Sequence, residues 1–290
     1  ECILPVIEQS VEQAGISLQQ VEALAVTQGP GLIGSLLVGV SAAKTLAFAL
    51  GLPLVGVHHL QGHLYSPNLS HSEIPYPHLG LVISGGHTSL YKVLSPVQAE
   101  VLGCTRDDAA GEAFDKIGKC LRLPYPGGPN IEKMARDYQG PVVKFPRPRF
   151  KTAGVHFSFS GLKTAAAQYI EAEKCAGREV NIPQVCQSFQ EVVLDCLSLP
   201  VFLALERENL HVLTVSGGVA ANGALRQRFE SLALEKNKRV YFAERKYCTD
   251  NAAMIGCAAA EHLSRGHSSP LTLGAQSRMK VTEVMQLYSR

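Results

Sequence analysis

The sequence predicts an α/β protein built of two lobes. Apolar strands alternate with helical segments along the chain, which is typical of α/β layers. With 290 residues and 46% hydrophobic content, the chain can bury a core larger than one small domain requires. Two apolar runs end at Ser-Gly-Gly, at 84–86 and at 216–218. Because glycine has no Cβ, backbone N–H groups at such tips are open to an anion, so the pair predicts a nucleotide held between them.

The first half of the chain alternates short apolar runs with glycine and proline turns. Gly29-Pro-Gly31 ends one strand and leads into a long apolar helix, and the first Ser-Gly-Gly turn closes a hairpin. The segment 32–50 contains Lys44, and its uncharged part is too short to cross a bilayer comfortably, so we expect a buried helix of a soluble protein. The predicted elements are a helix over 3–14, a strand over 21–26, a helix over 32–50, a strand over 53–57 and hairpin strands over 79–83 and 89–93.

The second half repeats the strand-and-glycine-turn pattern, which suggests two related halves. A Pro-Gly-Gly-Pro turn at 126–129 interrupts the helical pattern, and residues 140–160, rich in proline, phenylalanine and basic side chains, predict a loop. The predicted elements are helices over 108–121, from 130, and over 161–175, 184–209, 219–234 and 250–264, with strands over 211–215 and 239–243.

Charge and cysteine content narrow the class of protein. The net charge of +2 excludes a global basic field for nucleic acid and leaves a local patch. The eight cysteines include no Cys-x-x-Cys pair, which indicates reduced thiols in an intracellular compartment. The chain begins at Glu1 without a visible signal peptide, so we expect a fragment that has lost its true N-terminus.

Two histidines four residues apart are candidate metal ligands. His59 and His63 follow a strand and share one helix face, where two imidazoles could bind one transition-metal ion. Leu60 follows the first histidine, so the general base of the zinc-protease motif is missing. Asp250 is a candidate third ligand. The residues alone leave the alternatives open, namely two polar histidines in a turn and an aspartate that caps a helix.

Three further patterns have two interpretations each. Gly29-x-Gly31-x-x-Gly34 matches the dinucleotide fingerprint, but Pro30 removes a donor, so we prefer a tight turn. Asp115 either accepts a hydrogen bond from a ribose hydroxyl or belongs to a solvated face with Lys116 and Lys119. Basic and aromatic residues interleave after 143, forming either a phosphate-binding patch or a solvated loop in which Ser160 caps a helix. The candidate cations are Lys144, Arg147, Arg149, Lys151 and Lys163.

Taken together, these strings closely resemble the Kae1/TsaD/Qri7 family of tRNA N6-adenosine threonylcarbamoyltransferases, nearest its bacterial branch. The resemblance covers residues 20–262. It rests on Gly29-Pro-Gly-Leu32, His58-His-Leu-Gln-Gly-His63, Ser84-Gly-Gly-His-Thr88, Ala110-Gly-Glu-Ala-Phe-Asp-Lys116, Tyr125-Pro-Gly-Gly-Pro129, Phe157-Ser-Phe-Ser-Gly-Leu-Lys163, Ser216-Gly-Gly-Val-Ala-Ala-Asn222 and Cys248-Thr-Asp-Asn251.

The resemblance implies an actin-like ATPase (ASKHA) fold with the ligand cleft between two lobes. It implies transfer of threonylcarbamoyl from threonylcarbamoyl-AMP to N6 of adenosine 37 in tRNAs that read codons beginning with A. It also implies cytoplasmic location without a membrane, a paralogous partner subunit and an ATPase. His59, His63 and Asp250 would hold one divalent metal ion, Fe²⁺ or Zn²⁺. The residues that would contact the adenylate and the threonyl group are Ser84, Gly85, Gly86, His87, Thr88, Asp115, Gly128, Glu132 and Asn222.

The chain departs from the family pattern in two places. Gln61 stands where the family usually has glutamate, and no Gly-Ile-Glu-Thr-Ser-Cys-Asp-Glu-like strand opens the chain. We therefore expect an incomplete first lobe at 1–76, a second lobe with the nucleotide and metal motifs at 77–264, and a tail at 265–290 that returns to the first lobe. The general base is unknown. The alternatives are a carbamoyltransferase with a small-molecule acceptor, a non-catalytic nucleotide-binding scaffold and the old glycoprotease label.

Overall fold

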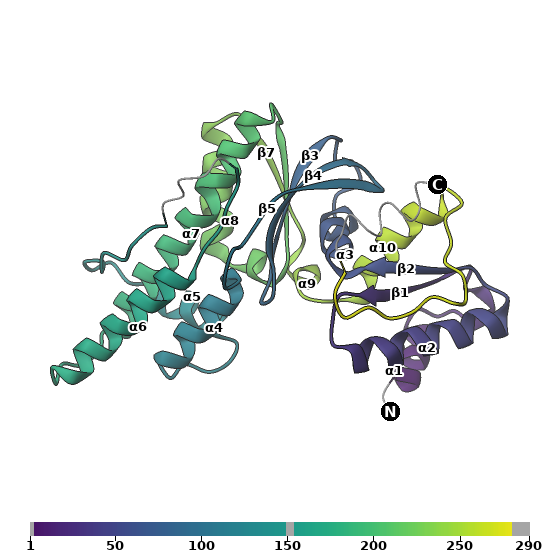
Figure 1. The fold of residues 1–290 in the computed structure, drawn as a ribbon, viewed down its shortest axis with the longest axis horizontal. Helices are drawn as coiled ribbons and strands as arrows, with labels where there is room; N and C mark the ends of the chain where they lie inside the picture. Colours follow the sequence, from purple (N-terminus) through teal and green to yellow (C-terminus); the bar gives the residue numbers. More distant parts are fainter. Residues whose placement is uncertain (1–2, 149–153, 280–290) are drawn as a thin grey trace.

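The computed structural model describes residues 3–148 and 154–279, which form two sheets with helices around them (Figure 1). The smaller sheet pairs two parallel strands, β1 (Leu24–Gly29) and β2 (Leu54–His58). The larger sheet has the order β5-β4-β3-β6-β7. Its strands are β3 (His78–Ile83), β4 (Thr88–Ser95), β5 (Gln98–Cys104), β6 (Val212–Ser216) and β7 (Arg239–Phe242). The two sheets lie on either side of the α3 region in the view of Figure 1.

Within the larger sheet, β3, β6 and β7 are parallel, while β3, β4 and β5 form an antiparallel meander. Because β3 and β6 run in the same direction, the two glycine turns that follow them lie at the same end of the sheet. The ten α-helices of the described chain are α1 (Ile3–Gln13), α2 (Ile33–Leu50), α3 (His59–Tyr65), α4 (Ala110–Cys120), α5 (Gly127–Ala135), α6 (Ser160–Cys175), α7 (Ile182–Arg207), α8 (Gly223–Glu235), α9 (Arg245–Cys248) and α10 (Ala252–Leu263).

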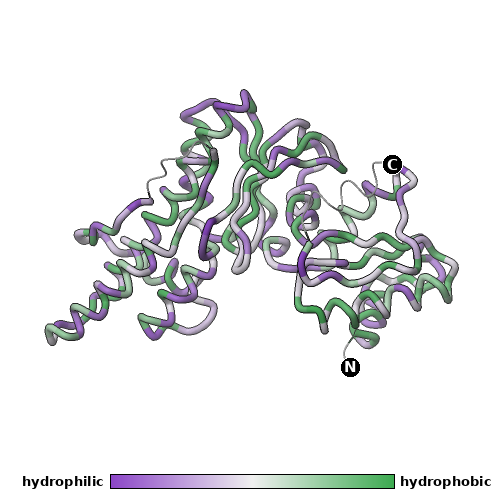
Figure 2. Tube along the Cα trace, in the orientation of Figure 1, coloured by the Kyte–Doolittle hydropathy of each residue, from purple (hydrophilic) through white to green (hydrophobic). Residues whose placement is uncertain are grey.

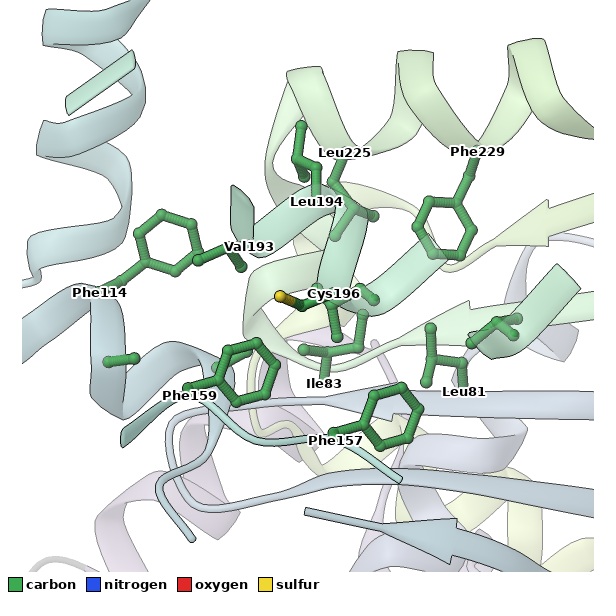
Figure 3. Close-up of a cluster of buried hydrophobic side chains, with 14 of the residues drawn as sticks. Leu81, Ile83, Phe114, Phe157, Phe159, Val193, Leu194, Cys196, Leu225 and Phe229 are labelled. Carbon is green, nitrogen blue, oxygen red and sulfur yellow. The ribbon is translucent and has the colours of Figure 1, made fainter. Parts of the chain in front are cut away.

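The main core fills the space between the larger sheet and helices α4 to α8. Phe114 and Phe189 meet edge to face at a centroid distance of 5.6 Å. Phe157 and Phe159 are buried in the same cluster (Figure 3). Leu81 and Ile83 of β3 supply the sheet side of this core. Because all six residues of β3 are buried, the strand is fixed on both faces and its C-terminal tip has a defined position.

A second core joins the two sheets. Val55 and Val57 of β2 pack with Leu64 of α3 and with Met254 and Ile255 of α10 in one buried cluster that also includes residues of β3 and β4. Helix α3 therefore lies between the two sheets. The expectation that the chain forms α/β layers is confirmed by this arrangement.

Some predicted elements differ from the structure. β5 was not predicted, because its mixed, largely exposed residues lack a buried face. The predicted helix over 219–234 begins later, at Gly223, since Asn222 caps α8 through its side chain after a 3₁₀ turn. The predicted helix over 250–264 begins at Ala252, and the short helix α9 precedes it.

The expectation that residues 32–50 form a buried helix is wrong in one respect. The helix exists as α2, but Leu32 is 81% exposed and Phe48 is 77% exposed within the described chain. Only the face with Leu36, Val40 and Ala47 is buried, because α2 contacts the small sheet from one side. Figure 2 shows the hydrophobic run along this helix. By length and composition, two helices of the described chain, α2 and α7, are apolar enough to cross a membrane, and α7 is mostly buried.

The segment after α10 lies along the smaller sheet. Ser269 bridges to Leu54, and the Gln276 amide donates to the carbonyl of Gln28 at 2.9 Å. The ammonium of Lys44 donates to the carbonyl of Leu273 at 3.0 Å. Since α10 also contacts β1, β2 and α3, we propose that the lobe boundary precedes α10 rather than following residue 264.

Candidate metal centre and active-site cleft

Three side chains from distant parts of the sequence meet beside the larger sheet. Asp250 Oδ1 lies 3.1 Å from His63 Nε2 and 3.5 Å from His59 Nε2. The three ligand atoms of this group all lie within 4.8 Å of one another. Ligand atoms bound to one tetrahedral zinc at 2.0–2.1 Å are about 3.3 Å apart, so both carboxylate distances suit a shared ion. The donor set of two imidazoles and a carboxylate fits zinc or iron.

Local sequence explains how the three residues converge. His58, the last residue of β2, caps α3 by accepting the Leu60 amide through its ring, so α3 begins directly at the end of the strand. The helix then places His59 and His63 one turn apart on one face. The capping alternative for Asp250 is wrong, because Asn251 caps α10 by accepting the Met254 amide. The Asp250 carboxylate is left facing the histidines and is 76% exposed.

The electrostatics of the cluster suit cation binding. Burial lowers the pKa of His59 and of His87, and the neighbouring imidazole of His63 lowers both further. The hydrogen bond from His63 holds the pKa of Asp250 below its usual value. At neutral pH, His59 and His87 are therefore neutral and the carboxylate is ionised, which is the protonation state that metal ligands require. The buried Nδ1 of His63 has no partner among the residues described.

Gln61 occupies the α3 position where the family pattern has glutamate. Its Nε2 lies 2.8 Å from Nε2 of His262 on α10, and its buried Oε1 has no hydrogen-bond partner in the described structure. The side chain thus turns away from the histidine cluster and links α3 to α10.

The two Ser-Gly-Gly turns lie side by side at one edge of the larger sheet, because β3 pairs with β6 in parallel with Val82 opposite Ser216. Gly217 has φ +90°, and a Cβ there would clash with the carbonyl oxygen of Ile83. Gly85 and Gly86 are exposed, and a Cβ on either would meet nothing within 4 Å. The first turn is fixed internally, since the Ser84 hydroxyl accepts the His87 amide at 3.1 Å.

A cleft of about 1000 Å³ opens between the two sheets at this point. On one side lie β1 and the turn after it, and on the other lie the first glycine turn and the histidine cluster. Its walls include Thr27, Pro30, Gly31, Leu32, His59, Ser84, Gly85, Gly86, His87, Asp250 and Ser277. The cleft residues on the β1 side were missed as site residues. The Gly29-Pro-Gly31 turn was the available signal: its string belongs to the family pattern, but we predict only a tight turn there and no contact with a ligand.

A second group of predicted residues lies along α4, α5 and the start of α8. A Cβ on Gly111 would clash with the backbone of Ser84 and Gly85, so α4 begins against the first glycine turn. Asp115 lies one helical turn further on, about 6 Å along the axis. Its carboxylate accepts the Gly127 amide at 2.7 Å. Asp115 therefore belongs to a wall formed by α4, α5 and the start of α8, which begins against the first glycine turn, although Asp115 itself does not border the cleft.

The rest of this wall is held by two hydrogen bonds. The Glu132 carboxylate accepts the Gly223 amide at 2.8 Å, and the Asn222 amide donates to Gln190 at 3.0 Å. Gly128 is open, since a Cβ there would come no closer than 3.9 Å to another atom. Thr88, on β4, is buried, and its hydroxyl oxygen accepts a hydrogen bond from the Ala110 amide at 3.0 Å. Asp115, Gly128, Glu132, Asn222 and Thr88 therefore have structural environments of their own, and none of them borders the cleft itself.

Two of the predicted basic residues are paired with carboxylates. Arg147 donates two hydrogen bonds to Asp195 at 2.8 and 2.6 Å, and Lys163 lies 2.5 Å from Asp108. Lys144 is exposed. The remaining two predictions, Arg149 and Lys151, fall outside the described residues. The Ser160 capping alternative is also wrong, because Asp107 accepts the Phe159 and Ser160 amides at the start of α6.

Comparison with protein families gives one match over most of the chain. The TsaD family, described as tRNA N6-adenosine threonylcarbamoyltransferase, matches residues 1–257. A protein of that name from Nostoc punctiforme is 47% identical over 293 aligned residues, covering 99% of this chain and 84% of the relative. Another from Moorella thermoacetica is 46% identical, covering 95% of this chain and 80% of the relative.

Solved structures show the fold at much lower identity. Full-length HypF, in a phosphate- and nucleotide-bound form, superimposes with a TM-score of 0.64 at 13% identity, covering 92% of this chain and 42% of that protein. HypF of T. kodakarensis gives a TM-score of 0.63 at 12% identity, covering 89% and 43%. The prediction of a two-lobe α/β fold is confirmed by these likenesses.

Proposed function

Because this chain belongs to the TsaD family of tRNA N6-adenosine threonylcarbamoyltransferases, we infer that its cleft carries out the transfer step of t6A synthesis. The enzyme is an acyltransferase. It transfers the threonylcarbamoyl group from threonylcarbamoyl-AMP to N6 of adenosine 37 in tRNAs that read codons beginning with A. The observation that carries this function is the family match over residues 1–257 together with relatives near 46% identity across the chain. The relatives' names lend no support to a small-molecule carbamoyltransferase.

The reaction requires the site to activate the carbonyl, align the two substrates and stabilise the departing phosphate. The C–N bond to N6 of adenosine forms while the carbonyl C–O bond to the AMP phosphate breaks, and N6 loses one proton. The exocyclic amine is a weak nucleophile, so the carbonyl must be polarised and the two substrates must be held in line. The departing phosphate requires stabilisation of its negative charge.

We propose that His59, His63 and Asp250 bind one divalent metal ion, iron or zinc. The convergence of their ligand atoms within 4.8 Å supports this assignment. When bound, such an ion supplies Lewis-acid polarisation and orients donor oxygens. A histidine whose lone pair binds a metal cannot act as the base, so the group that accepts the N6 proton is not assigned.

The glycine turns suit the phosphate of the adenylate. Gly85 and Gly86 leave open space where a side chain would stand, so an anion can approach the backbone of the segment from Ser84 to Thr88. His87 is neutral because of burial and can donate or accept a hydrogen bond there without adding charge.

The wall along α4 suits the adenosine part of the donor. We propose that Asp115 and Glu132 accept hydrogen bonds from ribose hydroxyls through the oxygens that their backbone contacts leave available. Gly128 lets a flat base approach the backbone, and Asn222 lines the same side. The continuity of this wall with the first glycine turn supports a donor that spans both.

Other parts of the proposal rest on the resemblance alone. These are a paralogous partner subunit, an ATPase of the same transfer complex and a cytoplasmic location. Of the three predicted tRNA contacts that lie within residues 3–148 and 154–279, only exposed Lys144 forms no ion pair. Arg147 and Lys163 would have to exchange their carboxylate partners for phosphate.

The function is tested with the full chain, threonylcarbamoyl-AMP and an unmodified tRNA that reads a codon beginning with A. The tRNA is digested to nucleosides, and t6A is identified by mass. A tRNA in which guanosine replaces adenosine 37 is the matched control. Formation of t6A in the first tRNA only supports the function, while its absence in the presence of the bound metal and the partner proteins refutes it.

A further inference from the structure

A second hollow lies at the C-terminal end of α4, beside the proposed adenosine wall. Its volume is about 390 Å³, and its lining includes Asp115, Lys119, Arg122, Tyr125 and Gly127. It shares Asp115 and Gly127 with the wall, but no residue of the main cleft borders it. The hollow is therefore a separate feature next to the place where the donor is proposed to bind.

The hollow presents two positive charges that no carboxylate neutralises. Lys116 is paired with Glu112 at 2.7 Å and with Asp108 at 3.0 Å. Lys119 and Arg122 are exposed and form no ion pair within residues 3–148 and 154–279. The Asp115 carboxylate also lines the hollow and accepts the Gly127 amide, and it forms no ion pair with either cation in the described residues. An anion that entered the hollow would meet both free cations.

Arg122 occupies a backbone position that favours glycine. Its φ is +58°, and the Leu123 amide bonds to the Gly118 carbonyl at 2.9 Å in the pattern that closes a helix at a left-handed residue. Lys119, in the last turn of α4, is explained by its favourable interaction with the helix dipole. Arg122 has no such explanation, because its left-handed backbone conformation is strained for any residue with a Cβ and is unstrained for glycine. Because strained backbone positions cluster at functional sites, this strain indicates a functional role for the Arg122 guanidinium.

Tyr125 is an aromatic side chain displayed on a fixed loop. It is 85% exposed. The amide of Asn130 donates to the carbonyls of both Pro124 and Pro126, at 3.0 and 2.9 Å. A Cβ on Gly127 would clash with the backbone of Phe114 and Asp115, so the loop packs directly on α4. A rigid exposed ring is a platform on which an unstacked nucleic-acid base can lie.

We propose that this hollow is a contact site for the tRNA substrate, in which Lys119 and Arg122 bind backbone phosphate and Tyr125 stacks on an unpaired base. The inference rests on the proposed function for the identity of the RNA. The geometry supplies the elements of single-strand recognition, namely two free cations and one aromatic face within one hollow. Its place beside the adenosine wall puts the bound RNA next to the donor.

Binding of unmodified tRNA by the full chain, measured by filter retention at several salt concentrations, tests the site. Tyr125→Ala is expected to weaken binding about 5- to 150-fold, the effect of one lost base stack, and Tyr125→Phe to restore it within about twofold. Arg122→Gly and Lys119→Ala are each expected to lower the slope of log Kd against log salt by about 0.7. Arg239→Ala, at an exposed arginine of β7, is the matched control and should change neither quantity.

Arg122→Gly separates binding from folding. Glycine fits the left-handed position, so this variant should melt no lower than the wild type while it binds tRNA more weakly. In the transfer assay, both Tyr125→Ala and Arg122→Gly should raise KM for tRNA and leave KM for threonylcarbamoyl-AMP unchanged.

The outcomes distinguish this site from the function itself. Unchanged tRNA affinity, salt slope and KM for tRNA in Tyr125→Ala and Arg122→Gly overturn the contact site even if the wild type makes t6A. If the wild type binds tRNA through these residues but makes no t6A, the proposed function fails and the RNA site stands.

Discussion

Nε2 of Gln61 lies 2.8 Å from Nε2 of His262, and both side chains are completely buried. The amide donates and the neutral ring accepts, so the remaining ring proton of His262 is on Nδ1, which faces Nδ1 of His267 at 3.4 Å. The contact joins the helix that carries both candidate metal histidines to α10, which follows Asp250 directly. The spacing of the three candidate ligands thus depends on a contact between α3 and α10 that lies outside the cluster itself.

Lowering the pH should destabilise the fold through two buried histidines, His262 and His78. Burial lowers the pKa of His262 to about 4, and that of His78 to about 4 as well, against 6.5 for an unperturbed histidine. Between these values the unfolded chain binds more protons than the folded chain, so stability falls as the pH drops from 6.5 to about 4. Each histidine contributes at most about 3 kcal/mol. Urea unfolding at pH 7.5, 6.0 and 5.0 measures the loss.

His262→Gln should flatten that pH profile while lowering stability at pH 7.5, because the Gln61 amide loses its ring acceptor. His211→Gln, at an exposed histidine, is the control and should leave the profile as it is in the wild type. A His262→Gln profile as steep as that of the wild type would show that His262 does not carry the acid sensitivity.

Removing a candidate ligand should release metal without unfolding the chain. Asp250 is largely exposed and His59 only half-buried, so Asp250→Ala and His59→Ala are expected to change the free energy of unfolding of the metal-free chain by less than about 1 kcal/mol. Metal content by elemental analysis should fall to background in both, and transfer activity should be lost. Asp137→Ala, at an exposed aspartate elsewhere, should retain both. Full metal occupancy in either ligand variant would remove that residue from the site.

The sequence predicted the convergence of the three candidate ligands better than their surroundings. His59 and His63 are four apart on a short helix, a local relationship that spacing reveals. Asp250 joined them by family resemblance, since local reasoning favoured a helix cap. The structure assigns the cap to Asn251 instead. Asp250 and Asn251 are adjacent, and aspartate and asparagine are equally good helix caps, so the sequence does not show which of the two caps α10.

The exposed face of α2 and the pairing of the basic residues could not be predicted, because both depend on distant parts of the chain. The composition of 32–50 indicates burial, yet packing supplies a neighbour on one side only. Arg147 meets Asp195, which is 48 residues away, and no local pattern announces that contact. Conversely, one of the two interpretations placed Lys119 on a solvated face; Lys119 is exposed, and it also lines a hollow with an exposed tyrosine.

Asn222 should affect donor binding beyond its structural role. Its side chain caps α8 by accepting the Leu225 amide at 2.9 Å and donates to Gln190 at 3.0 Å. Asn222→Ser keeps a capping oxygen but loses the amide donor, whereas Asn222→Ala loses both and should lower stability by about 1 kcal/mol. We expect both variants to weaken AMP binding, measured by calorimetry. An unchanged dissociation constant in both would exclude Asn222 from the pocket and leave it as a cap alone.

The two glycines of the second turn offer a matched test of how closely the strand tips must approach. Gly217 has φ +90°, and its added Cβ would strike the Ile83 backbone, whereas a Cβ on Gly218 would meet nothing within 4 Å. Gly217→Ala should therefore lower the free energy of unfolding by about 2 kcal/mol or more and displace the tip of β3. Gly218→Ala should change stability by less than about 0.5 kcal/mol. Equal unfolding midpoints in urea would mean that the tips do not need this contact. If instead only Gly217→Ala is destabilised and also binds AMP more weakly, the close approach of the two strands fixes the first glycine turn for the donor phosphate.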